Sequence, residues 1–519
     1  MQAEPANARP WVPRWVCWYA PLLAALVVAV LVWLPRDVGI NMTDEGFLWY
    51  GVQRTVAGDV PMRDFQAYDP GRYLWCAAFV PLLGDGILGV RGATALFAAL
   101  GLALALLVAG RFTRHPGELF VCALVLGLWL FPRHKLFEPA LASAALWFTV
   151  RLIESPTPLT HLASGVFVGA SAFFGRNHAL YAGLALGLCA VFLAWKRPEL
   201  RGARRAGAFA LGVALGLVPL GWMLCCVPGF AAGYARSLRL VLEHGANLTL
   251  PYPFPWRTAW SALAGWELAG QIALSTAFLA PFLLLPAGLW TALRTPAAAL
   301  RARAPVLAAF FAGAVYVHHA SVRSDASHLA QSFAPLAVLA LALSTLSAAR
   351  GVRALAWGTL GLVSALAALE ANTVLTRFRP DQGARLVACE VAGESLRLPV
   401  GQATLLRALQ DFAAELLPGE TPIWIVNQPT LYAVLRKSAP SWWLFFYWPE
   451  DDEAQRAHVQ ALEQRDVDFV LVHLGQADGS EARGFRNTHP LVWQHLLQEF
   501  RLLHLPGLPS NLQLFRKRT

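Results

Sequence analysis

Charged side chains are scarce in this sequence of 519 residues, where they make up 14% against about a quarter in an average soluble protein. Hydrophobic residues make up 56%. Stretches such as 93–110, 206–226 and 272–289 contain no charge, and with their flanks they approach the roughly 20 apolar residues that cross a bilayer. Because lipid offers a bare backbone no hydrogen-bond partner, each such stretch must be helical. The sequence therefore predicts an α-helical polytopic membrane protein.

Cysteine pairs and basic tracts are also missing. The seven cysteines include no Cys-x-x-Cys pair, so neither a disulfide framework nor a cysteine zinc site is indicated. The net charge is +10, but the arginines are scattered over connectors and no basic tract with interleaved aromatics occurs. We therefore expect no nucleic-acid partner. After residue 371 there is no GxGxxG or GxxxxGK[ST] loop that would cradle a nucleotide phosphate.

About eleven transmembrane helices are expected between residues 17 and 371, after a cytoplasmic N-terminus of residues 1–16. No small-residue cleavage pattern follows the first span, so we interpret it as an uncleaved helix. With the N-terminus inside, the cytoplasmic connectors are short and basic, as the positive-inside rule requires. The expected spans are 17–35, 89–110, 117–132, 137–152, 160–175, 178–195, 206–226, 270–291, 304–319, 329–347 and 353–371.

Two long connectors, 36–88 and 227–269, and a C-terminal domain over 372–519 are expected on the extracytoplasmic side. The domain alternates strand and helix patterns, which predicts a small α/β layer. Its expected strands are 422–426, 442–448 and 469–473, and its expected helices are 405–417, 430–436, 451–464 and 491–502. We expect this domain to serve as a scaffold or lid rather than as an independent catalytic unit.

Two adjacent carboxylates, Asp44 and Glu45, come shortly after the first span. Neighbouring residues cannot share one helical face, so one can point into a cavity while the other binds backbone or an arginine. A partly desolvated carboxylate at the membrane surface can act as a general base toward a hydroxyl. In the alternative interpretation, Thr43 or Asp44 caps a helix over 45–56, where acid at the positive end is stabilising. Both roles stay open.

The first outer connector also holds Arg63, Asp64, Asp69 and Arg72. Asp69 precedes a proline, which favours a turn. The two arginines can hold a phosphate, or they can form surface ion pairs with the acids, which is the commoner outcome.

Two short outer connectors are basic. The first contains Arg133, His134 and Lys135, and the second contains Arg176 and His178. Basic residues on the outer side oppose the positive-inside bias, so we expect them to have a partner. Arginine makes bidentate contacts to phosphate, while lysine and histidine add charge or a proton. The alternative partner is the headgroup phosphate of a membrane lipid.

The densest polar run between two spans covers 318–328 and includes His319, Arg323, Asp325 and His328. Such groups at the edge of a bilayer are costly unless they face protein or water, so they indicate a functional site. Histidine and aspartate are metal-ligand types, but their spacing matches no established ligand set. A divalent metal is therefore disfavoured, and no certain cofactor is expected.

Together these features resemble the GT-C glycosyltransferases. The features are a carboxylate pair after the first span, an outer loop punctuated by arginine and proline, a basic outer turn after the third span, and an Arg-x-Asp-x-x-His motif at 323–328. The most similar branch includes the dolichyl-phosphate-mannose protein mannosyltransferases and the lipid A aminoarabinose transferase. The resemblance covers about residues 15–372. The WWDYG run of oligosaccharyltransferases is absent, which disfavours transfer of a preassembled oligosaccharide to asparagine.

The resemblance implies an inverting glycosyltransferase in a bacterial inner or plasma membrane. It would transfer a sugar from a polyprenyl-phosphate donor to an envelope glycan, lipid or protein at the extracytoplasmic face. Asp44 would take the acceptor proton, and Glu45 would support it or orient a substrate. The candidates to hold the donor phosphate are Arg133, His134, Lys135, Arg176, His178, Arg323 and His328. The candidates to bind the acceptor or support the site are Arg63, Asp64, Asp69, Arg72, His319 and Asp325.

Two other functions compete with this one. The main alternative is a transporter or flippase of a lipid-linked or anionic solute, and the third is a non-enzymatic envelope assembly protein. A transporter commonly places charged or broken-helix features near mid-membrane, often in two related halves. Here the polar residues collect at one face and no internal repeat is found, so the enzyme is favoured.

Overall fold

The computed structural model describes residues 13–113, 115–245, 248–379, 385–419 and 421–518. Most of the predicted cytoplasmic N-terminus, residues 1–12, lies outside this range. The chain divides into two compact units. Unit 1 comprises 1–35, 94–221 and 247–383, and unit 2 comprises 36–93, 222–246 and 384–519. The predicted domain border at residues 371 and 372 stays a prediction.

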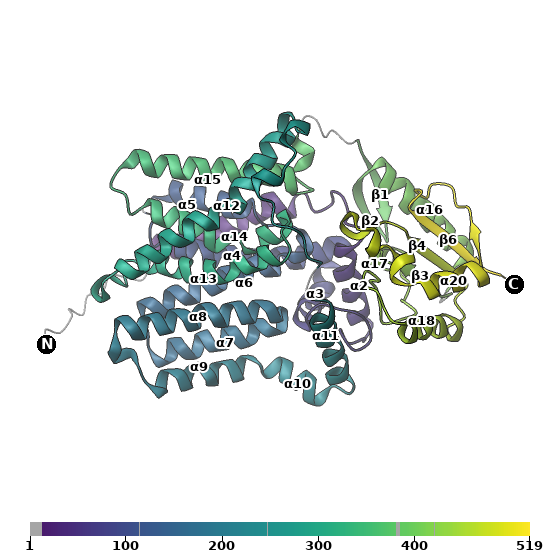
Figure 1. The fold of residues 1–519 in the computed structure, drawn as a ribbon, viewed down its shortest axis with the longest axis horizontal. Helices are drawn as coiled ribbons and strands as arrows, with labels where there is room; N and C mark the ends of the chain where they lie inside the picture. Colours follow the sequence, from purple (N-terminus) through teal and green to yellow (C-terminus); the bar gives the residue numbers. More distant parts are fainter. Residues whose placement is uncertain (1–12, 114, 246–247, 380–384, 420, 519) are drawn as a thin grey trace. The chain divides into compact units, whose positions relative to one another are not determined.

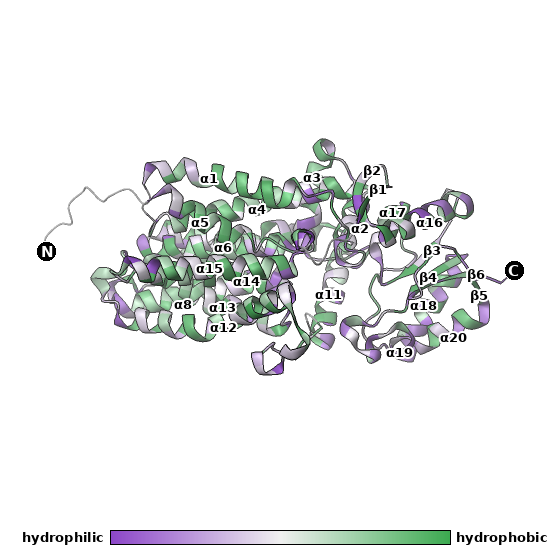
Figure 2. Ribbon diagram, turned by 90° about the horizontal axis from the view of Figure 1, so that it is seen from above, coloured by the Kyte–Doolittle hydropathy of each residue, from purple (hydrophilic) through white to green (hydrophobic). Residues whose placement is uncertain are grey.

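Unit 1 is built from apolar helices (Figures 1 and 2). In chain order they are α1 (Arg14–Val28), α4 (Ile87–Ala109), α5 (Pro116–Gly127), α6 (Phe137–Glu154), α7 (Pro158–Phe174), α8 (Arg176–Lys196), α9 (Ala203–Gly216), α10 (Val218–Cys226), α12 (Gly265–Arg294), α13 (Ala304–Val322), α14 (Ala326–Ser344) and α15 (Arg350–Ala371). Helix α1 continues as a π-helix over Ala29–Trp33. Helix α4 belongs to unit 1 from residue 94 onward, and α10 only up to residue 221. Many leucines on their outer faces are exposed, as Leu22 and Leu283 are, which suits a lipid environment.

Each of the eleven predicted spans coincides with a helix or a pair of helices. Eight helices of the described chain are long and apolar enough to cross a membrane, counting a short turn with the helix that follows it. The pair α9 and α10, bent by 49°, can form a ninth span. Pro219 stands in the first turn of α10, where a proline is tolerated but cannot continue the preceding helix. Helices α5 and α7 are shorter than a full crossing and account for the rest of the predicted eleven.

Helices α7 and α9 pack backbone against backbone through glycines. A Cβ atom placed on Gly169 would lie 2.3 Å from the carbonyl oxygen of Val213, and one on Gly212 would lie 2.1 Å from that of Leu162. Small residues four apart let apolar helices approach closely in lipid, where dispersion rather than water drives association.

Four helix ends that carry polar residues meet within unit 1. Helix α13 packs against α6, α8 and α14, and α6 also packs against α8 and α14. A 3₁₀ turn over Arg133–Lys135, here η2, leads directly into α6. The starts of α6, α8 and α14 therefore come together with the end of α13.

Unit 2 combines helices from the two long connectors with the C-terminal region. The connector helices are α2 (Asp44–Val56), α3 (Pro70–Leu83) and α11 (Phe230–His244). The C-terminal elements are β1 (Leu386–Val391), β2 (Glu394–Pro399), α16 (Val400–Leu416), β3 (Ile423–Val426), α17 (Pro429–Leu435), α18 (Asp452–Gln464), β4 (Phe469–His473), α19 (Phe485–Thr488), α20 (Pro490–Glu499), β5 (Phe500–Leu503) and β6 (Leu512–Lys517). Helix α2 packs against α3 and α17.

The described C-terminal strands form two sheets. Strands β1 and β2 make an antiparallel hairpin, and the other four follow the order β3-β4-β6-β5. Only the β3–β4 pair of the larger sheet is parallel. The small α/β character predicted for this region is therefore confirmed.

One predicted strand of this region is wrong, and one predicted helix ends earlier than expected. Residues 442–448 form no strand, because side chains take their backbone amides: Gln66 Oε1 accepts from Leu444 and Phe445, and Asn427 Oδ1 accepts from Phe446. The helix expected over 491–502 ends at Glu499, and the chain continues as β5. Residues 500–502 of the expected helix instead belong to β5 and pair with β6, and this tertiary pairing overrides the helical periodicity.

Candidate functional site

Three histidines from separate helices meet at one end of unit 1. His178 lies in the first turn of α8, His319 in the last turn of α13 and His328 in the first turn of α14. The ring centroids of His178 and His319 are 5.4 Å apart, and those of His319 and His328 are 5.2 Å apart. His178 and His319 are buried, and His328 is partly buried. We refer to these three residues as the histidine cluster.

Asp325 orients one member of this cluster. Its Oδ1 accepts from the backbone N–H of His328 at 2.8 Å, which caps α14, and from His328 Nδ1 at 2.9 Å. Its Oδ2 accepts from Arg323 Nε at 2.7 Å. Burial opposes the ionisation of Asp325, but the His328 hydrogen bonds and the Arg323 charge lower its pKa to about 2. The carboxylate thus holds the proton on Nδ1 of His328 and leaves Nε2 for another group.

Further polar groups surround the cluster. His319 Nε2 lies 2.9 Å from the amide oxygen of Gln331, so Nε2 is a donor. Lys135 and Glu138 from the start of α6 form an ion pair at 3.8 Å, and both charges act on His319. Tyr316 also lies beside His178, with ring centroids 5.7 Å apart.

The other predicted phosphate ligands lie on the same helix ends. Arg133 and Arg176 are partly buried, whereas His134 is buried. The structure thus brings Lys135, His178, Arg323 and His328 to one end of unit 1, together with the predicted supporting residues His319 and Asp325. Buried imidazoles next to a guanidinium and an ammonium group can bind an anion and exchange a proton with it.

The predicted carboxylate pair lies in unit 2, where its two members have different surroundings. Asp44 is exposed at the first position of α2, and Glu45 is buried. Thr43 holds the N-cap position and both acids lie in the first turn, as the capping alternative predicted. The Thr43 side chain makes no cap hydrogen bond, and Asn41 Oδ1 instead accepts from the backbone N–H groups of Thr43 and Asp44. The Asp44 carboxylate therefore lies at the positive end of the helix, and Asn41 rather than Asp44 caps the backbone there.

Glu45 is held by Arg91. Arg91 Nε lies 2.6 Å from Glu45 Oε1, and its Nη2 lies 2.6 Å from Oε2. The same guanidinium donates to the carbonyl oxygens of Arg36 and Gly39. Arg91 was missed in the sequence analysis, although an arginine inside an apolar stretch implies a buried partner.

The other predicted residues of the first connector form local contacts. Arg63 and Asp64 make a two-pronged ion pair with distances of 2.8 and 2.7 Å. The hydrogen bond from Arg63 lowers the pKa of Asp64. Asp69 is buried at the start of α3, and the buried Arg72 guanidinium lies 5.1 Å from the centre of the Tyr68 ring.

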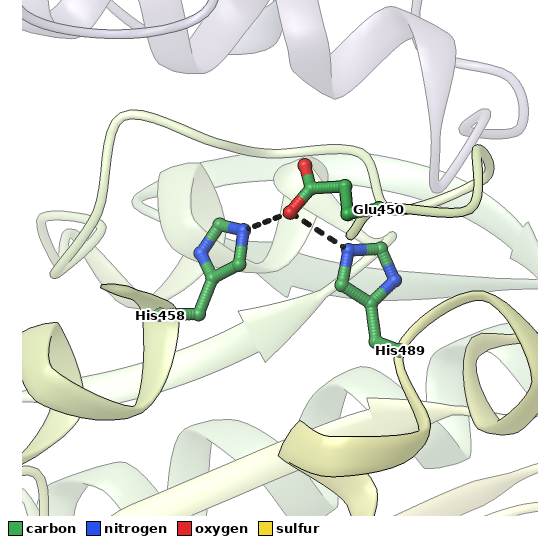
Figure 3. Close-up of side chains that lie close together, drawn as sticks. All are labelled: Glu450, His458 and His489. Carbon is green, nitrogen blue, oxygen red and sulfur yellow. Dashed lines mark hydrogen bonds and ion pairs between the residues drawn. The ribbon is translucent and has the colours of Figure 1, made fainter. Parts of the chain in front are cut away.

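Only one group of side chains in the described part of the chain has the composition and closeness of a metal site. It consists of Glu450, His458 and His489 in unit 2, whose ligand atoms all lie within 4.8 Å of one another (Figure 3). It does not include the run 318–328 that the sequence drew attention to. The spacing of these three residues in the sequence does not indicate a metal site, because only the tertiary fold brings them together.

No family model matches the chain, and no curated protein matches its sequence. Among solved structures, ArnT from Cupriavidus metallidurans bound to undecaprenyl phosphate has a TM-score of 0.53 at 15% identity, covering 96% of this chain and 97% of that one. ArnT in the apo state has a TM-score of 0.54 at 15% identity, covering 95% and 97%. The likeness confirms the expected GT-C fold: an integral-membrane helical part with a small C-terminal α/β region.

A weaker likeness, with a TM-score of 0.44 at 13% identity, extends to the archaeal oligosaccharyltransferase AglB from Archaeoglobus fulgidus in complex with an inhibitory peptide and a dolichol-phosphate. It covers 96% of this chain and 75% of that one.

Proposed function

We propose that this protein is a glycosyltransferase that moves a sugar from a polyprenyl-phosphate donor to an envelope glycan, lipid or protein. The observation that carries the proposal is the histidine cluster with Asp325 and Arg323 at one end of an apolar helical bundle. A lipid-linked donor reaches such a site within the membrane, so no nucleotide-binding loop is needed. The ArnT likeness supports this choice, because ArnT is described with undecaprenyl phosphate bound.

The unit 1 cluster would bind the donor phosphate. When the bond between the sugar and the phosphate breaks, negative charge grows on the phosphate oxygen, and fixed cations stabilise it there. Arg323 and Lys135 supply permanent positive charge. His328, whose Nδ1 is held by Asp325, presents Nε2 for a hydrogen bond or a proton. Arg133, His134, Arg176 and His178 complete the proposed phosphate-binding set.

Asp44 is proposed as the general base. It takes the proton of the acceptor hydroxyl while the acceptor oxygen bonds to the anomeric carbon, and the phosphate leaves from the opposite face, which inverts the configuration. Asp44 suits this role because it is exposed in the first turn of α2. Glu45 acts as a positioning residue, since its carboxylate is occupied by Arg91.

The acceptor would be met on the extracytoplasmic side of a bacterial inner or plasma membrane. In unit 2 the two connectors predicted to be outside pack with the C-terminal region: Trp442 Nε1 donates to Met62 O, and Arg236 lies 5.0 Å from the Trp442 ring. Segments that pack in one unit share one side, so this packing supports the predicted orientation. We propose that four residues of the first connector support this packing in unit 2: Arg63, Asp64, Asp69 and Arg72.

Binding of undecaprenyl phosphate to the full chain in detergent tests the proposal. Losing one charge-assisted hydrogen bond costs about 1.5–3 kcal/mol, so Arg323→Gln and His328→Gln should each weaken binding roughly 10-fold to 150-fold. Arg201→Gln is the matched control, because Arg201 is exposed on another connector. Equal affinity for phosphatidate and undecaprenyl phosphate would instead indicate a lipid-headgroup site. Unchanged binding in both folded variants would overturn the donor assignment.

A further inference from the structure

The Glu450, His458 and His489 side chains converge from three segments of unit 2 (Figure 3). Glu450 lies just before α18, His458 lies within α18, and His489 lies between α19 and α20. His458 Nε2 is 2.7 Å from Glu450 Oε2, and His489 Nε2 is 3.5 Å from the same oxygen. His458 and His489 are buried, whereas Glu450 is partly exposed and so gives the site a path to solvent.

The hydrogen bonds of His489 determine which of its two ring nitrogens carries the proton and which is an acceptor. Its Nδ1 lies 2.9 Å from Thr488 Oγ1. The Thr488 hydroxyl donates its own proton to a carbonyl oxygen, with Phe446 O nearest at 2.9 Å, so it accepts from His489 Nδ1. In a neutral ring, His489 Nε2 therefore carries a lone pair.

That lone pair faces a carboxylate. His489 is fully buried, and its Nε2 has no hydrogen-bond partner within the described residues. A buried lone pair and a carboxylate side by side are unfavourable unless a cation lies between them.

We propose that Glu450, His458 and His489 bind one divalent transition-metal ion, with zinc the best match to two imidazoles and one carboxylate. Zinc takes such ligands at about 2.0–2.2 Å, which places tetrahedral ligand atoms roughly 3.4 Å apart. The 3.5 Å separation between His489 and Glu450 already fits this geometry, and the 2.7 Å contact of His458 must open by a small side-chain rotation. A water molecule would fill the fourth position.

The surroundings of the site are already ordered for such an ion. Gln455 Nε2 donates to the backbone carbonyl of Glu450, and its Oε1 accepts from the backbone N–H of Leu491. The His489 Nδ1 contact with Thr488 is the kind of second hydrogen bond that orients a metal-bound imidazole. Bound zinc would fasten the loop before α18 to the α19–α20 junction and so stabilise the C-terminal region.

Zinc analysis of the full chain, purified in detergent without a polyhistidine tag, tests the proposal. We expect about one zinc ion per chain that survives dialysis. His489→Gln should weaken zinc binding roughly a hundredfold or more, as should His458→Gln, whereas the exposed His504→Gln should leave it unchanged. Chelation should lower the melting temperature of the wild type and not that of the folded His489→Gln protein.

X-ray absorption of the zinc-loaded wild type keeps the proposal testable if the variants fail to fold. Two imidazole nitrogens and oxygen neighbours at about 2.0–2.1 Å are expected. A wild-type chain that binds no stoichiometric zinc would overturn the proposal. So would a folded His489→Gln protein that binds zinc as tightly as the wild type, or a spectrum without imidazole ligands.

Discussion

Arg91 and Glu45 form a buried, two-pronged ion pair, with both hydrogen bonds 2.6 Å long. Each side chain is almost fully shielded from solvent. The pair ties the start of α4 to the start of α2, beside the exposed Asp44. A buried pair of this kind is costly to break from one side, because the remaining charge stays in a low-dielectric setting.

Replacing Glu45 with glutamine should therefore destabilise the protein. We expect a loss of about 3–5 kcal/mol, since Arg91 keeps its charge and loses its counter-ion. The melting temperature and the yield of monodisperse protein in detergent are the measurements. The matched control is Arg397→Gln, which breaks the exposed ion pair with Asp37 and should cost about 1 kcal/mol or less. Equal losses in both variants would contradict the structural role of the buried pair.

Replacing Asp44 with asparagine should abolish most sugar transfer and leave the fold intact. Asparagine keeps the size of the side chain but cannot take a proton, so we expect transfer to fall about 10²-fold to 10⁴-fold. Mass analysis of envelope glycans from cells that carry the wild type or the variant is the measurement. Undecaprenyl phosphate binding should not change. Transfer at the wild-type rate would disprove the base assignment. Asp452→Asn, which changes an exposed side chain at the start of α18, is the control.

The charge on Asp325 should stabilise unit 1 in a pH-dependent way. Its folded pKa of about 2 lies below the ordinary value of 3.8. The resulting stability is fully present above pH 3.8 and is lost as the pH falls toward 2. The melting temperature of the wild type should therefore approach that of Asp325→Asn as the pH falls from about 4 to about 2. A gap between the two proteins that stays constant over this range would contradict the ion pair with Arg323 and His328.

The close contact of α7 and α9 should not tolerate a side chain at Gly169. A Cβ atom there would lie 2.3 Å from a backbone oxygen of α9, so Gly169→Ala must push the two helices apart. Loss of packing of this kind typically costs about 1–3 kcal/mol. Thermal unfolding in detergent is the measurement. Gly187→Ala in α8 is the control, because no atom lies within 4 Å of its added Cβ and the change should be neutral or slightly stabilising.

Much of the fold follows from local patterns in the sequence. The long uncharged stretches had to become helices, because a backbone in lipid can satisfy its hydrogen bonds only within itself. The helix after Asp44 and the buried strand Phe469–His473 were also predictable from periodicity. The strand expected at 442–448 was not formed, because Gln66, from a segment far away in the sequence, takes two of its amides.

The sequence by itself determined that the chain is a helical membrane protein with polar helix ends, because charge and hydropathy are local properties. It also placed Asp325 three residues before His328, a spacing that a helix start converts into a capped pair. Only the tertiary structure decided that His178, His319 and His328 are neighbours, that Arg91 neutralises Glu45, and that Glu450 meets His458 and His489. Such contacts join residues far apart along the chain, and the packing of whole helices and strands sets their distances.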